Sequence, residues 1–234
     1  MADRYLQKDG KTLKNKLGVF HDPDALAAKE AVYVNSRVME LHATGFPQVE
    51  GFELVKSVHQ YLFQDIYDWA GQLRETKLAR ATYAGGHGEF VRFTEPSRIE
   101  PEGRQLFAEL AAANHLRGLA RAHFAKELAH FFGRLNQLHP FREGNGRTQR
   151  LVWEHLAKQA GHDLSFEGIS RERMVTASIA ASSGDCEPAR RIFNELLDPV
   201  RSQALRAATR FLEAHRNEVN WQERYVATTE PGWS

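Results

Sequence analysis

An apolar stripe in the middle of the chain is the strongest constraint that this sequence places on its fold. Its members lie three or four residues apart: Phe124, Leu128, Phe132, Leu135 and Leu138. That spacing puts all of them on one face of a helix, and a stripe this apolar should be buried. The helix should end at His139-Pro140, because a residue before proline is pushed out of the right-handed α region. The sequence therefore predicts a buried central helix that presents an imidazole at its C-terminal end.

Helical patterns also surround this central segment. A start signal at 22–24 opens a first helix, which Gly45-Phe46-Pro47 breaks, and a second helix runs from near Glu50 to Trp69. Further helices are predicted at about 147–160, 170–182, 187–197 and 200–216. The predicted fold class is all-α.

The segment from Leu73 to Phe93 departs from this pattern. Two short β-prone runs flank the turn Gly85-Gly86-His87-Gly88, which predicts a β-hairpin. Because an isolated hairpin is only marginally stable in water, we expect a mobile flap that lies on a helical body.

Whole-chain properties exclude several classes of protein. The 234 residues can bury a core of their own, and Cys186 is the only cysteine, which fits a reducing cytoplasm. Residues 1–18 lack the apolar region of a signal peptide, and no run approaches the roughly 20 apolar residues of a membrane span. A net charge of +1 creates no global field toward nucleic acid. We therefore expect neither nucleic acid nor membrane as a partner, and any phosphate binding must come from a local site.

Twelve consecutive residues, 139–150, combine the groups that handle a polyphosphate. They read His-Pro-Phe-Arg-Glu-Gly-Asn-Gly-Arg-Thr-Gln-Arg. Glu143 offers a hard oxygen ligand of the kind that Mg²⁺ takes, and the turn at 144–146 can bring unpaired amides close to a ligand. The helix that follows attracts phosphate at its N-terminus, and Arg147 and Arg150 share one of its faces. The segment predicts a polyphosphate site beside an imidazole.

This segment resembles the Fic-family signature, His-x-Phe-x-Asp/Glu-Gly-Asn-Gly-Arg-x-x-Arg, at every specified position. The run Trp69-Ala70-Gly71-Gln72-Leu73-Arg74 is similar to the family's approach to its substrate-docking flap. The resemblance covers about residues 15–200 and implies the mainly helical Fic fold with a short β-hairpin flap. It divides the chain into a Fic domain with an N-terminal extension at 1–200, with the flap at about 74–95, and a C-terminal helical extension and tail at 201–234.

The resemblance implies a protein adenylyltransferase, which moves AMP from ATP onto a Ser, Thr or Tyr hydroxyl of a target protein. His139 would be the general base, a role that an ordinary histidine pKa of about 6.5 suits at neutral pH. Glu143 would hold Mg²⁺. The contacts to the nucleotide would come from Phe141, Gly144, Asn145, Gly146, Arg147 and Arg150.

Within that set the resemblance implies separate tasks. The amides of 144–146 and the Asn145 side chain would cradle the phosphates, Arg147 would neutralise the β/γ end and Arg150 would fix the γ-phosphate. Phe141 would anchor the loop in the core. Doc-like kinases carry a lysine where this chain has Gly146, which favours adenylylation over phosphorylation. In the flap, the target would be added as an extended strand by Thr76, Lys77, Leu78 and Phe90.

The resemblance also implies partners and a cellular setting. Many Fic proteins carry an inhibitory Ser/Thr-x-x-x-Glu-Gly/Asn pattern, but Glu40, Glu187 and Glu213 are each followed by another residue type. A separate small antitoxin would therefore supply the inhibitory helix. Residues 13–18 and 227–232 resemble Fic modules joined to conjugative relaxases or type IV secretion effectors. The chain would then be the front part of a longer protein, acting in the bacterial cytoplasm or in a recipient or host cell.

Two other functions stay open. One is a catalytically silent Fic-fold binding module, against which the presence of both His139 and Glu143 argues. The other is a related transferase that uses another nucleotide or phosphocholine. His123, Glu127 and His130 lack the adjacent His-Glu pair of a zinc protease motif, and we interpret them as surface residues.

Overall fold

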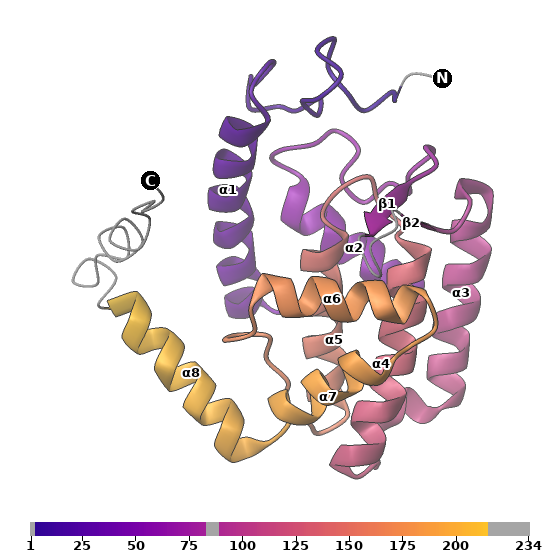
Figure 1. The fold of residues 1–234 in the computed structure, drawn as a ribbon, viewed down its shortest axis with the longest axis vertical. Coiled ribbons are helices and arrows are strands. Elements are labelled where there is room, and N and C mark those ends of the chain that lie inside the picture. Colours follow the sequence, from indigo (N-terminus) through magenta and orange to yellow (C-terminus); the bar gives the residue numbers. More distant parts are fainter. Residues whose placement is uncertain (1–2, 83–88, 215–234) are drawn as a thin grey trace, which may run out of the picture.

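Helices dominate the structure, a computed structural model that describes residues 3–82 and 89–214 (Figure 1). The helices are α1 (Pro23–Thr44), α2 (Phe52–Phe63), α3 (Pro96–Ala112), the short 3-10 helix η2 (Asn114–Leu116), α4 (Arg121–Leu138), α5 (Asn145–Gln159), α6 (Arg171–Ser182), α7 (Glu187–Leu196) and α8 (Pro199–Ala214). The mainly helical fold is confirmed. The predicted glycine turn at 85–88 and the tail at 217–234 lie outside the described residues.

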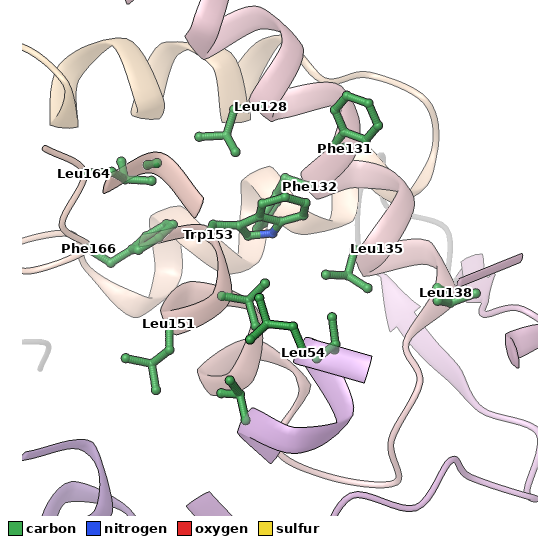
Figure 2. Packing of buried hydrophobic residues seen from close by; sticks show 14 of the residues in the cluster. Leu54, Leu128, Phe131, Phe132, Leu135, Leu138, Leu151, Trp153, Leu164 and Phe166 are labelled. Atoms are coloured by element: carbon green, nitrogen blue, oxygen red, sulfur yellow. The ribbon is translucent and has the colours of Figure 1, made fainter. Parts of the chain in front are cut away.

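The central helix of the prediction is α4, and it is buried as expected. Each residue of the predicted stripe is at most 3% exposed. Contacts with α3, α5, α6 and α7 surround α4. Figure 2 shows Leu128, Phe132 and Leu135 of α4 pointing into a cluster that includes Trp153 of α5 and Phe166 from the loop after it. The core of the molecule therefore lies around α4 and α5, the two helices that the 139–150 segment joins.

The second predicted helix is shorter than its apolar pattern suggested. Helix α2 ends at Phe63, so the expectation that this helix reaches Trp69 is wrong. Ile66 and Trp69 are buried, but they lie in turns after the helix. Lys16 of the N-terminal segment donates its backbone N–H to Ile66 O (2.8 Å) and its ammonium to Gln64 O (2.9 Å). Long-range hydrogen bonds thus use the carbonyls that a longer α2 would have bonded within itself.

The predicted hairpin is present, and its base is attached to the end of α4. Strand β1 (Ala79–Thr82) pairs antiparallel with β2 (Glu89–Arg92), with Ala79 opposite Arg92 and Thr82 opposite Glu89. Thr94 then donates its N–H to Gln137 O of α4 (3.1 Å). The Gln137 side chain donates in return to Arg92 O (2.8 Å). The two strands therefore leave the body beside the C-terminal end of α4.

The C-terminal helices complete one side of the body. Helices α6 and α7 pack against α4 and against each other, while α8 continues from α7 toward the side of the molecule where α1 lies (Figure 1). None of the described helices combines the length and the apolar character that crossing a membrane requires.

Gly103 of α3 provides a test of how tightly the helices pack. A Cβ at this position would lie 2.5 Å from Cε1 of the buried Phe52 ring. Gly103→Ala should therefore lower the free energy of unfolding by about 1–3 kcal/mol through overpacking. This loss should exceed the stabilisation that comes from the higher helix propensity of alanine. Phe52→Leu should recover part of this loss in the double variant, which urea unfolding would measure. A Gly103→Ala variant as stable as the wild type would contradict the packing described for α2 and α3.

Candidate active site

The turn between α4 and α5 is formed by two left-handed backbone positions. His139 caps α4 with φ 44° and ψ 62°, and its N–H is donated to Leu135 O (3.1 Å). Gly144 precedes α5 with φ 84°. Helix α5 begins at Asn145, two residues earlier than predicted, and no side chain caps its first turn. The first N–H groups of a helix have no partner within it, so this turn presents free amides and the positive end of a helix dipole.

Phe141 and Asn145 hold the turn from inside. The Phe141 ring is fully buried. The Asn145 side chain accepts from Phe141 N (2.9 Å) and donates to Phe141 O (2.8 Å). The predicted anchoring role of Phe141 matches this placement. The Asn145 side chain spends one bond at each of its polar atoms on the turn, and its predicted part in the phosphate cradle stays a prediction.

His59 of α2 also supports this turn, and it was not predicted from the sequence. Its Nδ1 accepts from Gly71 N (2.8 Å), so Nε2 carries the proton and donates to Glu143 O (3.0 Å). Its ring also stacks on Phe141, with centroids 3.7 Å apart. Burial, together with the charge of Arg147, lowers the pKa of His59 to about 3. The sequence did hold one signal, a histidine within the apolar face of residues 52–62. Such a position indicates a buried, neutral imidazole that must form a hydrogen bond at each ring nitrogen.

A cavity of about 690 Å³ opens in front of the turn. Most of the predicted catalytic and phosphate-binding residues line it: His139, Glu143, Gly144, Gly146, Arg147 and Arg150. The structure adds wall residues that the sequence did not single out, namely Lys11 of the N-terminal segment, Glu30 of α1, Tyr67 and Arg171 of α6. Segments far apart in the chain therefore close around the predicted motif.

The two motif arginines lie in different electrostatic surroundings. Arg147 forms ion pairs with Glu30 (Nη1 to Oε1, 2.5 Å) and with Glu143 (Nη2 to Oε1, 3.2 Å). The Tyr67 hydroxyl donates a short hydrogen bond to Glu30. Burial, followed by the charge of Glu30, raises the pKa of Tyr67, so the phenol stays protonated. For Arg150, burial lowers the pKa and the adjacent charge of Arg147 lowers it further. A bound anion beside Arg150 would oppose this lowering of its pKa by stabilising the charged guanidinium.

A larger groove of about 1280 Å³ lies on the far side of these arginines. Arg147 and Arg150 line this groove as well as the smaller cavity. Its other walls come from α1, α5 and the loop after α5, with Arg210 of α8. The arginines thus face two open spaces, and only the smaller of them is also lined by His139 and Glu143.

The surroundings of Glu143 suit a magnesium ion. Its side chain is 45% exposed, and Oε1 accepts from Gly144 N (2.8 Å). Among residues 3–82 and 89–214, no group of three or more His, Cys, Asp or Glu side chains could hold a metal by itself. A single carboxylate beside a phosphate site is the usual protein contribution to bound Mg²⁺, which takes its other ligands from phosphates and water.

The predicted flap residues lie in the hairpin and in the segment that leads into it. Lys77 is exposed and pairs with Glu95 (3.0 Å), and Leu78 is half-buried. The backbone of Phe90 pairs with Ala81, while its side chain lies outside the described residues. Just after β2, the Phe93 ring stacks on the His139 ring with centroids 3.8 Å apart and planes at 12°. The hairpin therefore reaches the proposed base directly.

The central-helix histidines are placed as interpreted. His123 and His130 are exposed on α4, and Glu127 is half-buried. They belong to its outer side and not to the cavity.

Comparisons with known proteins agree with this geometry. The sequence profile of the Fic/DOC family matches residues 51–157. A protein adenylyltransferase of Bartonella henselae is 36% identical over 95% of this chain, and the chain spans only 42% of that relative. A probable protein adenylyltransferase Fic of Salmonella typhimurium is 37% identical over 85% of this chain and 94% of the relative. The structure of the BepC protein, a VirB-translocated effector of Bartonella tribocorum with bound AMPPNP, has a TM-score of 0.72 at 32% identity and covers 82% of this chain and 95% of its own.

The neutral state of His59 predicts a pH dependence of stability. In the unfolded chain its pKa would be about 6.5, whereas burial holds it at about 3 in the folded protein. The unfolded state therefore binds more protons between these values, and stability falls as the pH falls below about 6.5. The loss attributable to this one group should reach about 2 kcal/mol at pH 5.

Urea unfolding of the wild type and of His59→Gln between pH 7.5 and 5 would measure this contribution. The His59→Gln variant should be less stable at pH 7.5, and its free energy of unfolding should fall less steeply as the pH is lowered. His123→Gln, which changes an exposed imidazole of α4, is the matched control and should show the same pH dependence as the wild type. Parallel curves for all three proteins would rule out a neutral buried His59.

The two glycines of the motif should respond differently to alanine. At Gly144, where φ is 84°, a Cβ would lie 2.4 Å from the Phe63 ring. Gly144→Ala should cost at least about 2 kcal/mol of stability through backbone strain and overpacking. Gly146→Ala, whose Cβ would meet no heavy atom within 4 Å, should change it by less than about 0.5 kcal/mol. Denaturant unfolding compares the pair, and equal losses would refute the described turn.

Proposed function

Because the chain belongs to the Fic/DOC family and is an enzyme of the protein adenylyltransferase class, we propose that it transfers AMP from ATP to a Ser, Thr or Tyr hydroxyl of a target protein and releases pyrophosphate. One observation carries the proposal. The imidazole of His139, the carboxylate of Glu143, two arginines and the open first turn of α5 all line the same cavity of about 690 Å³. The AMPPNP bound to the Bartonella tribocorum effector supports ATP as the nucleotide.

His139 is proposed to act as the general base. It would take the proton from the target hydroxyl while the hydroxyl oxygen attacks the α-phosphorus in line, and the bond from that phosphorus to the leaving pyrophosphate breaks. Its backbone caps a buried helix and its ring stacks on Phe93, which limits the positions that the imidazole can take. Glu143 would hold Mg²⁺, which supplies positive charge beside the phosphates when it is bound.

Phosphate binding would fall to the first turn of α5 and the arginines. Gly144 and Gly146 line the cavity, and the amides of this first turn would receive phosphate oxygens at the positive end of the helix, the Gly144 amide in place of its bond to Glu143. Arg150 is the stronger candidate for the γ-phosphate, because it is a half-buried cation beside a second cation, and both factors lower its pKa. Arg147 would reach the β/γ end while it remains paired with Glu30. The open space beside Gly146 supports the adenylylating orientation.

The hairpin is proposed to dock the target. An edge strand offers unpaired N–H and C=O groups, to which an extended target segment can add as a further strand. The segment 76–78 leads into β1, and Phe93, just after β2, touches the His139 ring. A target strand on this hairpin would therefore present its hydroxyl near the base.

Control by a separate antitoxin is proposed from the larger groove. Val34, Val38 and Leu41 of α1 and Arg150 of α5 are among the residues that line it. A helix that carries a glutamate would find apolar side chains and the half-buried guanidinium of Arg150 there. We propose that such a helix from a small antitoxin restrains the activity of a toxin or secreted effector.

The wider setting follows from the same relatives. We propose that residues 1–200 form the catalytic domain and 201–234 a C-terminal extension; the chain spans 42% of the Bartonella henselae relative and 94% of the Salmonella typhimurium one. The likeness to a VirB-translocated effector supports action either in the bacterial cytoplasm or after translocation.

Radiolabelled nucleotides test the proposed reaction. Compared with a cell lysate alone, a lysate to which the protein is added should gain label from α-³²P-ATP and gain none from γ-³²P-ATP. His139→Ala should reduce this transfer by about 10²-fold or more, and Glu143→Ala should remove both the transfer and its dependence on Mg²⁺. His123→Ala, an exposed histidine of α4, is the control and should label like the wild type.

The other functions would give distinct results. Label from the γ-phosphate would indicate a kinase, preference for another nucleotide or for a phosphocholine donor would indicate a related transferase, and no transfer at all would indicate a binding module. Transfer by His139→Ala at the wild-type rate would remove the assignment of the general base.

A further inference from the structure

Arg74 is a fully buried cation outside the motif, between α2 and the hairpin, and only 1% of its surface is exposed. All of its side-chain hydrogen bonds go to main-chain carbonyl oxygens. Nε donates to His139 O (2.7 Å), Nη1 to Thr76 O (2.8 Å), and Nη2 to Thr94 O (2.5 Å) and Leu138 O (3.3 Å). One guanidinium therefore joins the last residues of α4 to the segments that enter and leave the hairpin.

These acceptors explain how a charge can be buried here. The carbonyls of Leu138 and His139 belong to the C-terminal end of α4, where unpaired carbonyl groups carry the negative end of the helix dipole. A cation is favourable at that position, and the planar fork of arginine can satisfy several carbonyls at once. Burial nevertheless lowers the pKa of Arg74 to about 10, and the nearby charge of Glu95 opposes this shift.

The backbone that Arg74 holds needs external support. The backbone of His139 has a left-handed conformation, which residues other than glycine rarely adopt. Besides the bond from its side chain to His139 O, Arg74 donates its own N–H to Pro140 O (2.9 Å). The two bonds fix consecutive carbonyls of the turn on which the imidazole is mounted.

Arg74 also holds the backbone next to Phe93, the residue whose ring stacks on His139. Thr94, whose carbonyl accepts from Nη2, directly follows Phe93, and the Phe93 ring lies on the His139 ring. On the other side of the hairpin, Thr76 O accepts from Nη1 in the segment that leads into β1. Moving Arg74 would therefore release the base of the hairpin and the backbone of His139 together.

We propose that Arg74 is a positioning residue that fixes the distance between the general base His139 and the hairpin that docks the target strand. This inference rests on the proposed function. A transfer between a bound hydroxyl and a bound nucleotide depends on this distance, and a misplacement of about 1 Å can cost on the order of 10²-fold in rate. Arg74 does not line the ATP cavity, so its effect should fall on the transfer step and on target docking, and not on nucleotide binding.

The kinetic test uses Arg74→Lys in the full chain. A lysine keeps the charge, but its single ammonium cannot span the four carbonyls. We expect kcat for target adenylylation to fall about 10- to 100-fold and KM for the target to rise, while the Kd for ATP stays within about twofold. Ile192→Ala, a cavity in the buried face of α7, is the control for lost stability. It should keep kcat per folded molecule within about twofold, with both variants assayed where circular dichroism shows them folded.

Two further measurements do not depend on activity. In wild-type protein without nucleotide, the ring proton signals of His139 should carry the ring-current shift of Phe93, and Arg74→Lys should reduce that shift. If the variant does not fold, hydrogen exchange of the wild type replaces it. The amides of Arg74, Thr94 and His139 should then open as one unit with the same protection.

The outcomes separate the two proposals. If the wild-type protein transfers no AMP, the proposed function is wrong. The positioning role would still hold in that case if Arg74→Lys reduces the ring-current shift of His139, or if the three amides share the same protection. The positioning role is overturned if kcat of a folded Arg74→Lys stays within twofold of wild type, if the loss appears wholly as weaker ATP binding, or if the Thr94 amide opens separately.

Discussion

Buried polar side chains hold the turn between α4 and α5, and the candidate site depends on this. Apolar burial brings the two helices together, but a turn inside the core must still pair its peptide groups. Asn145 satisfies both polar backbone atoms of Phe141, and His59 binds the carbonyl of Glu143. Leaving such groups unpaired would cost about 1–3 kcal/mol each. The positions of the proposed catalytic and phosphate-binding groups depend on these few hydrogen bonds.

Charge is arranged locally in a chain that is nearly neutral overall. Arg147 is shared between Glu30 and Glu143, so part of its charge is already balanced before any nucleotide binds. Arg150 is half-buried, and burial and the neighbouring charge of Arg147 both lower its pKa. The two arginines of one helical face therefore differ in how far their charges are balanced by protein groups. This difference is consistent with the proposed roles, in which Arg150 fixes the γ-phosphate and Arg147 reaches the β/γ end while it stays paired with Glu30.

The hairpin is part of the site because of where its two ends are attached. Its strands are short, and two strands alone would be marginally stable. Hydrogen bonds from Arg74 to Thr76 O and Thr94 O, and from Thr94 to Gln137 O, fasten its base to α4. The proposed docking element and the proposed base are consequently carried by one buried framework.

The sequence alone determined the helical class, the burial of α4, its end at His139 and the chemical content of residues 139–150. These features depend on neighbours a few residues apart, through helical periodicity, the restriction before Pro140 and the free amides of a helix start. Only the tertiary structure decided the roles of His59, which bonds a residue 84 positions away, and of Arg74, which bonds one 65 positions away. It likewise ended α2 at Phe63, because carbonyls after it pair with the N-terminal segment. Local patterns carry no information about such partners, because packing brings them together only after the helices have formed.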